Sequence, residues 1–291
     1  MDLFKHVSKI IIKEARDVDR ELFYFFFMDG SKEDVITHLK AYQHPSGGFS
    51  NGLEPDYLNP YPSAIQTWTA IHYFKDIKLD IDDDLVVNTV KYLESEMEEK
   101  DFFETVHQKN NDYPHAIWWH YKEGQSIWGF NPSISLWAFL YEVKKGQKAK
   151  TLIEKAFDAF ILEPKIEMHE LKAFIDAYEW LYDLKNDFPN FLDFEEKLIH
   201  QVLNILRTYQ PEDLSYGPSP IGFFDDVQKQ LYRHIKPYID IQVNHLKKVI
   251  PEDDLWDVPF SWGQYESHFQ KAKTEWKCIQ AIKYLRFILK K

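Results

Sequence analysis

The sequence of 291 residues contains a single cysteine, Cys278, and no long apolar run. One cysteine excludes an internal disulfide and any cysteine-based zinc cluster, and it is typical of a reducing compartment. The apolar run at residues 22–28 ("LFYFFFM") follows acidic residues, whereas a secretory signal has a basic region there. It also falls far short of the ~20 apolar residues of a membrane span. We therefore expect a cytoplasmic protein without a membrane span.

Positive charge is also scarce. The chain has 35 Lys and Arg against 47 Asp and Glu, which gives a net charge of −12. This balance argues against a nucleic-acid partner, because phosphate binding requires a basic surface. His-Glu-x-x-His, a phosphate-binding glycine-rich loop and Gly-x-Ser-x-Gly are all missing from the sequence. Cys278 has no companion ligand pattern, so we expect neither a metal ion nor another cofactor.

Aromatic residues, by contrast, are abundant. They make up 16% of the chain, with 9 Trp, 17 Tyr and 22 Phe. This content excludes a disordered or fibrous chain. So many rings require either a broad core or a cavity lined by rings.

Helical periodicity dominates the chain, and no sustained alternation of apolar and polar residues suggests a sheet. The predicted helices cover residues 3–28, 32–43, 63–76, 83–99, 132–144, 148–162, 168–184, 192–209, 219–234, 236–249 and 268–289. No linker rich in Pro, Gly and Ser divides them. The sequence therefore predicts an all-α protein with one domain over residues 1–291.

Two of the helical segments are almost uncharged. Residues 62–74 ("PSAIQTWTAIHYF") and 131–143 ("NPSISLWAFLYEV") both open with Pro-Ser and carry a tryptophan, Trp68 or Trp137, soon after. A helix that is apolar nearly all round must be buried on several sides. The segments 83–99 and 148–162 are highly charged and should each have one wet face. This alternation is a weak internal repeat, which is typical of a stacked or closed array of helices.

Residues 39–49 ("LKAYQHPSGGF") look like the Gln–Gly–aromatic motif of the terpenoid cyclases and of protein prenyltransferase β subunits. Three further segments resemble uncharacterised bacterial proteins placed in that superfamily. They are "YPHAIWWHY" (113–121), "GFNPSISLWAFLYE" (129–142) and "FSWGQYESHFQKAKTEWKCIQAIKYL" (260–285). The resemblance implies an α/α toroid, in which an inner ring of helices lies within an outer ring around a central cavity.

Residues 80–83 ("DIDD") match the Asp-x-Asp-Asp acid motif of class II terpenoid cyclases as a string. They nevertheless lie between the predicted helices 63–76 and 83–99, on a connection that does not lead into a buried helix. Asp82 or Asp83 as an N-cap explains them, because acidic groups are favoured at helix N-termini. We expect Asp80, Asp82 and Asp83 to be exposed residues at a helix start.

The loop at residues 50–61 does lead into a buried helix, and it carries Glu54 and Asp56. The resemblance implies that such a loop lies at the cavity mouth, where a partly desolvated acid could act as a general acid. Alternatively, both carboxylates accept backbone N–H groups of their own loop, as Asp does in turns. Both interpretations stay open at this point.

A second group of candidates lies in the loop before the other buried helix. His115 could shuttle a proton near neutral pH, and the neighbouring Trp118 and Trp119 could stabilise a cation, stack on a sugar or line a prenyl pocket. Trp262, in "PFSWGQY", is a further pocket candidate. Packing of a long loop is the alternative. In a toroid, Glu54, Asp56, His115, Trp119 and Trp262 would converge around one mouth.

Three functions fit these patterns. The first is an isoprenoid-processing enzyme similar to a cyclase or prenyltransferase, the second a carbohydrate-active enzyme or sugar binder, and the third a non-catalytic toroid that binds a partner. The ligand would be an apolar or sugar-like small molecule. The candidate catalytic residues are Glu54, Asp56 and His115, and the candidate substrate-binding residues are Trp68, Trp118, Trp119, Trp137 and Trp262.

Overall fold

The computed structural model describes residues 2–213, 216–224 and 229–290. Within these residues every regular element is a helix, and the extended segments form only isolated β-bridges. This confirms the all-α prediction. In the same part of the chain, no helix is both long and apolar enough to cross a membrane.

The chain divides by its internal contacts into two compact units, and the prediction of a single domain stays a prediction. The first unit consists of Met1–Ala41, Ala116–Trp118 and Leu206–Lys291, and the second of Tyr42–His115 and Trp119–Ile205. The α-helices of the first unit are α1 (Leu3–Glu14), α2 (Asp17–Phe27), α3 (Lys32–Leu39), α10 (Pro220–Phe223), α11 (Tyr232–Val249) and α12 (Glu266–Leu289). Those of the second unit are α4 (Ala64–Asp76), α5 (Asp84–Glu99), α6 (Ser133–Lys144), α7 (Gln147–Leu162), α8 (Met168–Leu181) and α9 (Phe191–Leu206). Short 3-10 helices cover Lys40–Tyr42, Gln108–Asp112, Ile117–Trp119 and Tyr182–Asp187.

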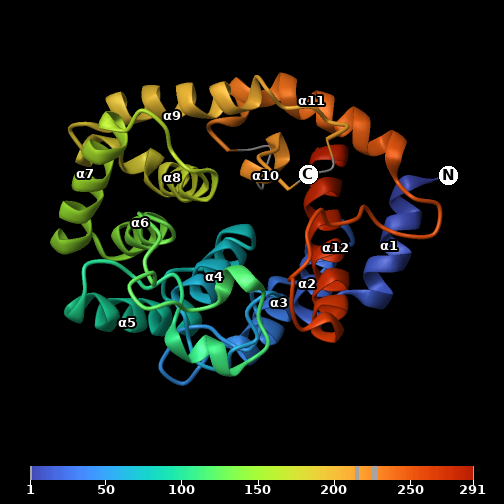
Figure 1. Cartoon of the computed structure of the whole chain (residues 1–291), viewed down its shortest axis with the longest axis horizontal. Coiled ribbons are helices and arrows are strands. Elements are labelled where there is room, and N and C mark those ends of the chain that lie inside the picture. Colours follow the sequence, from blue (N-terminus) through green and yellow to red (C-terminus); the bar gives the residue numbers. More distant parts are fainter. Residues whose placement is uncertain (1, 214–215, 225–228, 291) are drawn as a thin grey trace. The chain divides into compact units, whose positions relative to one another are not determined.

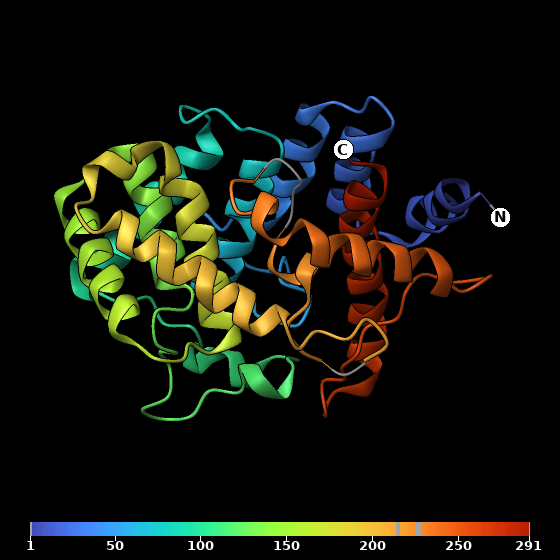
Figure 2. The ribbon, with the colours of Figure 1, turned by 90° about the horizontal axis from the view of Figure 1, so that it is seen from above.

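Helix α12 is the centre of the first unit. It contacts α1, α2, α10 and α11, and Figure 2 shows α11 (orange) crossing it (red). Arg286 of α12 is buried, and its guanidinium lies 4.0 Å from the ring centre of Phe26. This unit therefore has its own core around one long helix.

Helix α6 is the centre of the second unit. Every residue of 133–141 is buried, and Trp137 is packed edge-on against Phe102 and Phe130 with ring centres 5.2 and 6.2 Å away. The helix contacts α4, α5, α7 and α8. The prediction that this nearly uncharged segment is buried on several sides is confirmed.

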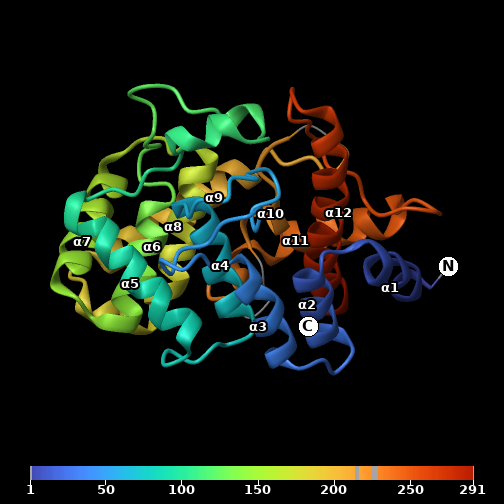
Figure 3. The ribbon, with the colours of Figure 1, turned by 90° about the horizontal axis from the view of Figure 1, so that it is seen from below.

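Helices α4, α6 and α8 of the second unit lie next to one another and form a row. Helices α5, α7 and α9 lie along one side of that row (Figures 1 and 3). Helix α4 is buried on most of its surface, but Trp68, Thr69, His72 and Lys75 are only half-buried. Because these positions share one helix face, α4 presents a polar and aromatic stripe beside its apolar one.

The starts of α4 and α5 follow from capping side chains. Ser63 accepts a hydrogen bond from the N–H of Gln66, and Asp83 accepts one from the N–H of Leu85 at 2.8 Å. Each satisfies a backbone donor that has no partner within the helix. Asp80 and Asp82 are exposed as expected, whereas Asp83 is half-buried. The interpretation of residues 80–83 as part of a helix start is confirmed, with Asp83 as the N-cap.

Predicted and observed helices differ in three places. No break separates the helices predicted over 219–234 and 236–249, because α11 runs without interruption from Tyr232 to Val249. The helix predicted over 3–28 is broken at Ala15. Helix α2 starts where Arg16, whose side chain is 7% exposed, pairs at 2.6 Å with Asp19, an acid in the first turn of that helix. The helix predicted over 219–234 begins as α10, which ends one residue after Gly222, a residue of low helix propensity. Residues 225–228 of that prediction lie outside the described part of the chain.

The capping role of Asp83 can be measured against its exposed neighbour. We expect Asp83→Ala to lower the free energy of unfolding by about 0.5–2 kcal/mol, because the N–H of Leu85 loses its acceptor. Asp82→Ala removes a carboxylate of the same charge next to it and should change stability by less than about 0.5 kcal/mol. Urea unfolding followed by circular dichroism measures both. Equal losses in the two variants would contradict the capping assignment.

Candidate functional site

The turn at residues 44–48 is fixed by one amide side chain. Gln43 Nε2 donates to the carbonyl oxygens of Gly47 and Leu85, each at 3.0 Å, and lies 3.2 Å from Thr89 Oγ1. The turn is thereby attached to the first turns of α5. Gly47 has φ +101°, and a Cβ there would lie 2.1 Å from the carbonyl oxygen of Asn88, so only glycine fits.

A second amide holds the acidic loop that follows. Gln66 of α4 is fully buried. Its Oε1 atom accepts hydrogen bonds from the N–H groups of Gly52, at 2.8 Å, and Leu53, at 3.0 Å. The loop is therefore attached to the helix into which it leads. For these two N–H groups, the acceptor is an amide of the helix rather than a carboxylate of the loop.

Both candidate acids of this loop are buried. Glu54 is 9% exposed and Asp56 is 3% exposed. The hydroxyl of Thr69 donates to Glu54 Oε2 at 3.2 Å. Since Thr69 lies on the half-buried stripe of α4, the Glu54 carboxylate is located beside that stripe.

The same stripe meets charged side chains of α8. His72 Nε2 lies 3.2 Å from Asp176 Oδ2, and Lys172 Nζ lies 2.5 Å from Asp176 Oδ1. The Asp176 side chain is 2% exposed, whereas that of His72 is 26% exposed. The carboxylate is thus buried between an imidazole and an ammonium group, and the imidazole is partly exposed.

The candidate Trp68 belongs to this arrangement. Its Nε1–H donates to Ser135 Oγ of α6 at 3.2 Å, and its ring is edge-on to His72 with centres 5.0 Å apart. Lys172 Nζ lies 5.9 Å from the ring centre. We call Glu54, Trp68, His72, Lys172 and Asp176 the α4–α8 cluster. All its members lie in the second unit.

His115 is held by protein atoms on both sides of its ring. Its Nδ1 lies 2.6 Å from the carbonyl oxygen of Tyr113, and its Nε2 lies 3.1 Å from Nδ1 of His120, whose ring stacks on it. Burial lowers the pKa of His115, and the neighbouring His120 lowers it further. The residue also forms a β-bridge with Tyr57, so its loop runs beside the acidic loop. The neutral imidazole is therefore the favoured form in the folded protein.

The remaining candidate tryptophans lie among other rings. Trp119 stacks on Trp128, with ring centres 5.2 Å apart, and is edge-on to Tyr57 at 5.6 Å. Trp118 belongs to the first unit, where it packs against Phe260. Trp262 is fully buried in that unit, and its carbonyl oxygen accepts the N–H of Ile117. Trp137 packs in the core around α6, as described above.

Glu54, Asp56, His115 and Trp119 share the second unit, and Trp262 belongs to the first. Their convergence around one mouth stays a prediction. The structure places Glu54 beside Thr69, on the stripe of α4 that also carries Trp68 and meets α8. It adds three residues that sequence reasoning missed: His72, Lys172 and Asp176.

Two signals could have identified the missed residues. His72 follows Trp68 by four positions in a nearly uncharged helix, so both must lie on the same face. Lys172 and Asp176 have the i, i+4 spacing of a helical ion pair. The pairing of His72 with Asp176 spans two helices, and nothing in the local pattern predicts it.

The cluster contains the groups that acid–base chemistry requires. A carboxylate beside an imidazole orients the ring and stabilises its protonated form. A histidine in this setting can accept or donate a proton near neutral pH. In the described part of the chain, no group of three His, Cys, Asp or Glu side chains could hold a metal ion. No known family model, curated protein or solved structure matches the chain.

The lowered pKa of His115 predicts a pH dependence of stability. A histidine with a depressed pKa binds fewer protons in the folded than in the unfolded state, so stability falls as pH drops below the ordinary value of 6.5 towards the lower folded pKa. We expect the free energy of unfolding to decrease over this window in the native protein and to decrease less in His115→Gln. Urea unfolding at a series of pH values measures both slopes.

His200→Gln is the matched control, because His200 is exposed on α9 in the same unit. It should keep the slope of the native protein. An unchanged slope in His115→Gln would contradict the role given to burial.

Proposed function

We propose that this protein is an α/α toroid of the terpenoid cyclase and prenyltransferase type that processes an isoprenoid. The row of α4, α6 and α8 with α5, α7 and α9 on its other side supports the fold. The attachment of the Gln43 turn to α5 supports it as well, since this is the segment with the Gln–Gly–aromatic resemblance. Phe49, the aromatic residue of that segment, is buried and packs edge-on against Phe74 at 5.9 Å.

One observation supports the reaction most strongly: a buried carboxyl group, Glu54, lies beside a helix face that carries Trp68 and the His72–Asp176 pair. Burial disfavours the ionised form of a carboxyl group, so such a group is suited to donate a proton. The face of a tryptophan ring attracts a cation. Together they are the groups that an acid-initiated reaction on an apolar chain needs.

In the proposed reaction, Glu54 protonates a carbon–carbon double bond. The π electrons form the new C–H bond, the carboxylate remains on the protein, and the cation on the neighbouring carbon is stabilised by the ring of Trp68. His72 then removes a proton from an adjacent carbon, whose C–H electrons form a new double bond or complete a ring. Asp176 holds the imidazole in place and stabilises its protonated form. The proton returns to Glu54 through solvent, so the reaction is redox-neutral.

A second candidate, a carbohydrate-active enzyme or sugar binder, is favoured by the charge of the same stripe. Asp176 and Lys172 are ionic partners beside Trp68, and sugars stack on tryptophan while their hydroxyl groups bind to charged side chains. Lys172 has no part in the reaction proposed above for an apolar chain, whereas a sugar hydroxyl could bind to it. The two candidates therefore differ in which part of the cluster contacts the ligand.

A screen with prenyl diphosphates and oligosaccharides tests the proposal. Binding is followed by tryptophan fluorescence and product formation by mass spectrometry. We expect turnover of a prenyl substrate, with Glu54→Gln losing at least about 10²-fold in kcat, the usual contribution of a general acid. His72→Gln should lose activity to a similar extent.

Glu123→Gln, a change at an exposed loop residue of the same unit, is the control and should keep full activity. Circular dichroism and thermal unfolding establish that each variant is folded. Binding of oligosaccharides alone would favour the second candidate. Undiminished turnover in folded Glu54→Gln would contradict the role of the acid.

A further inference from the structure

The loop at residues 50–61 contains the only Asn-Gly pair of the sequence, Asn51–Gly52. Asparagine deamidates most readily before glycine, because glycine has no side chain to keep its backbone nitrogen away from the amide carbon of the asparagine. The turn nevertheless favours both residues. Asn51 has φ +62° and Gly52 has φ +78°, and Asn-Gly is the pair that adopts two consecutive positive φ values most easily. A Cβ on Gly52 would also lie 2.8 Å from the side chain of Leu58. The local fold of the loop therefore selects a reactive pair.

Deamidation of this pair is a ring closure followed by hydrolysis. The backbone nitrogen of Gly52 loses its proton to water and attacks Cγ of Asn51. The new C–N bond closes a cyclic succinimide, and the side-chain nitrogen takes up a proton and leaves as ammonia. Water then opens the ring at either carbonyl group, which gives aspartate or isoaspartate without any oxidation or reduction. The first step requires a Gly52 nitrogen that is free to lose its proton and to turn towards Asn51.

The structure holds that nitrogen in place. Asn51 is exposed, so water can reach its side chain, but the N–H of Gly52 donates to Oε1 of Gln66 at 2.8 Å. The acceptor belongs to a fully buried side chain of α4. The same oxygen accepts the N–H of Leu53, and Nε2 of Gln66 donates to the carbonyl oxygen of Asn59 at 3.3 Å. Because a hydrogen-bonded N–H must be released before it can react, the amide of Gln66 opposes the first step.

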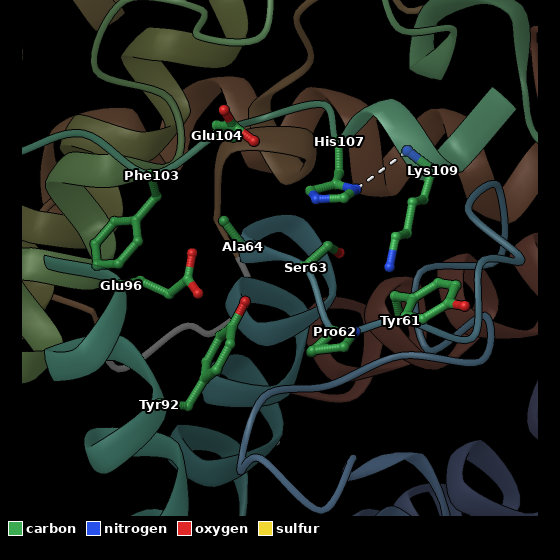
Figure 4. Close-up of a pocket in the computed structure, with 10 residues that line it drawn as sticks. All are labelled: Tyr61, Pro62, Ser63, Ala64, Tyr92, Glu96, Phe103, Glu104, His107 and Lys109. Atoms are coloured by element: carbon green, nitrogen blue, oxygen red, sulfur yellow. Dashed lines mark hydrogen bonds between the residues drawn. The ribbon is translucent and has the colours of Figure 1, made fainter. Parts of the chain in front are cut away.

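Packing holds the other end of the loop less completely. A pocket of about 180 Å³ lies between residues 61–63, where the loop enters α4, and Tyr92 and Glu96 of α5 (Figure 4). This space leaves part of the end of the loop without a protein neighbour. The hydrogen bonds of Gln66 therefore contribute a larger share of the attachment of the loop.

We propose that Asn51 is a deamidation site of this protein and that Gln66 protects it in the folded chain. Release of the loop from the Gln66 amide exposes the Gly52 nitrogen and allows the reaction. The product places an additional carboxylate in the loop that carries Glu54, and isoaspartate also changes the course of its backbone. The proposal does not depend on the reaction proposed for the α4–α8 cluster, because the modification is measured without a substrate.

Peptide mass spectrometry after incubation at mildly alkaline pH measures the rate of deamidation at Asn51. We expect the folded native protein to react at least about tenfold more slowly than the same protein unfolded in urea. Gln66→Met keeps the length of the side chain but removes the acceptor, so the folded variant should react at least about fivefold faster than the native protein. Gln66→Glu keeps an oxygen acceptor and should react more slowly than Gln66→Met.

Gln43→Met is the matched control. The Gln43 amide holds the preceding turn through Gly47, Leu85 and Thr89 rather than through Gly52. This variant should therefore deamidate at Asn51 at close to the native rate. Thermal unfolding verifies that each variant is folded, and the comparison of folded with unfolded native protein needs no variant. Equal rates in folded and unfolded native protein, no acceleration in folded Gln66→Met, or equal acceleration in Gln66→Met and Gln43→Met would each overturn the proposal.

Discussion

The burial of residues 133–141 of helix α6 is the constraint on which the second unit depends. Residues 133–141 have no face that water can reach, so this helix needs apolar neighbours on every side. Helices α4, α5, α7 and α8 supply them. The neighbours of α6 within its own row, α4 and α8, cannot cover the whole surface of α6. Helices of a second row, α5 and α7, are therefore needed to cover the rest. The charged helices α5 and α7 can take the outer position because each has one apolar and one wet face.

The same constraint decides where polar chemistry can occur. Helix α4 must give most of its surface to the core, so only the stripe with Trp68, Thr69 and His72 is left for other contacts. The loop that enters α4 is attached to it through Gln66, which brings Glu54 to that stripe. Two amides, of half-buried Gln43 and buried Gln66, therefore connect the local geometry of the turn to the location of the acid. Buried polar groups fulfil such a role only when their hydrogen bonds are made, as they are here.

The parts of the structure that follow from local chemistry could be predicted from the sequence. The all-α class, the buried segments and the start of α5 at Asp83 depend on periodicity, composition and capping, which are local properties. The break between α1 and α2 could not be predicted from the sequence. It coincides with an ion pair between the buried side chains of Arg16 and Asp19, whereas the helical pattern of the sequence is continuous there. The pairing of His72 with Asp176 could not be predicted for a different reason. It depends on how α4 and α8 are placed across α6, and the sequence of neither helix encodes that placement.

The composition of the α4–α8 cluster is itself an argument for function. Asp176 is almost fully buried, and removing a carboxylate from water costs more than an ion pair usually returns. Apolar side chains in place of His72, Lys172 and Asp176 would complete the packing of α4 and α8 without that desolvation cost. Local departures of this kind are expected where a protein binds or transforms a ligand. The imidazole of His72 is partly exposed while its carboxylate partner is not, so the cluster keeps the group that orients the imidazole inside the protein.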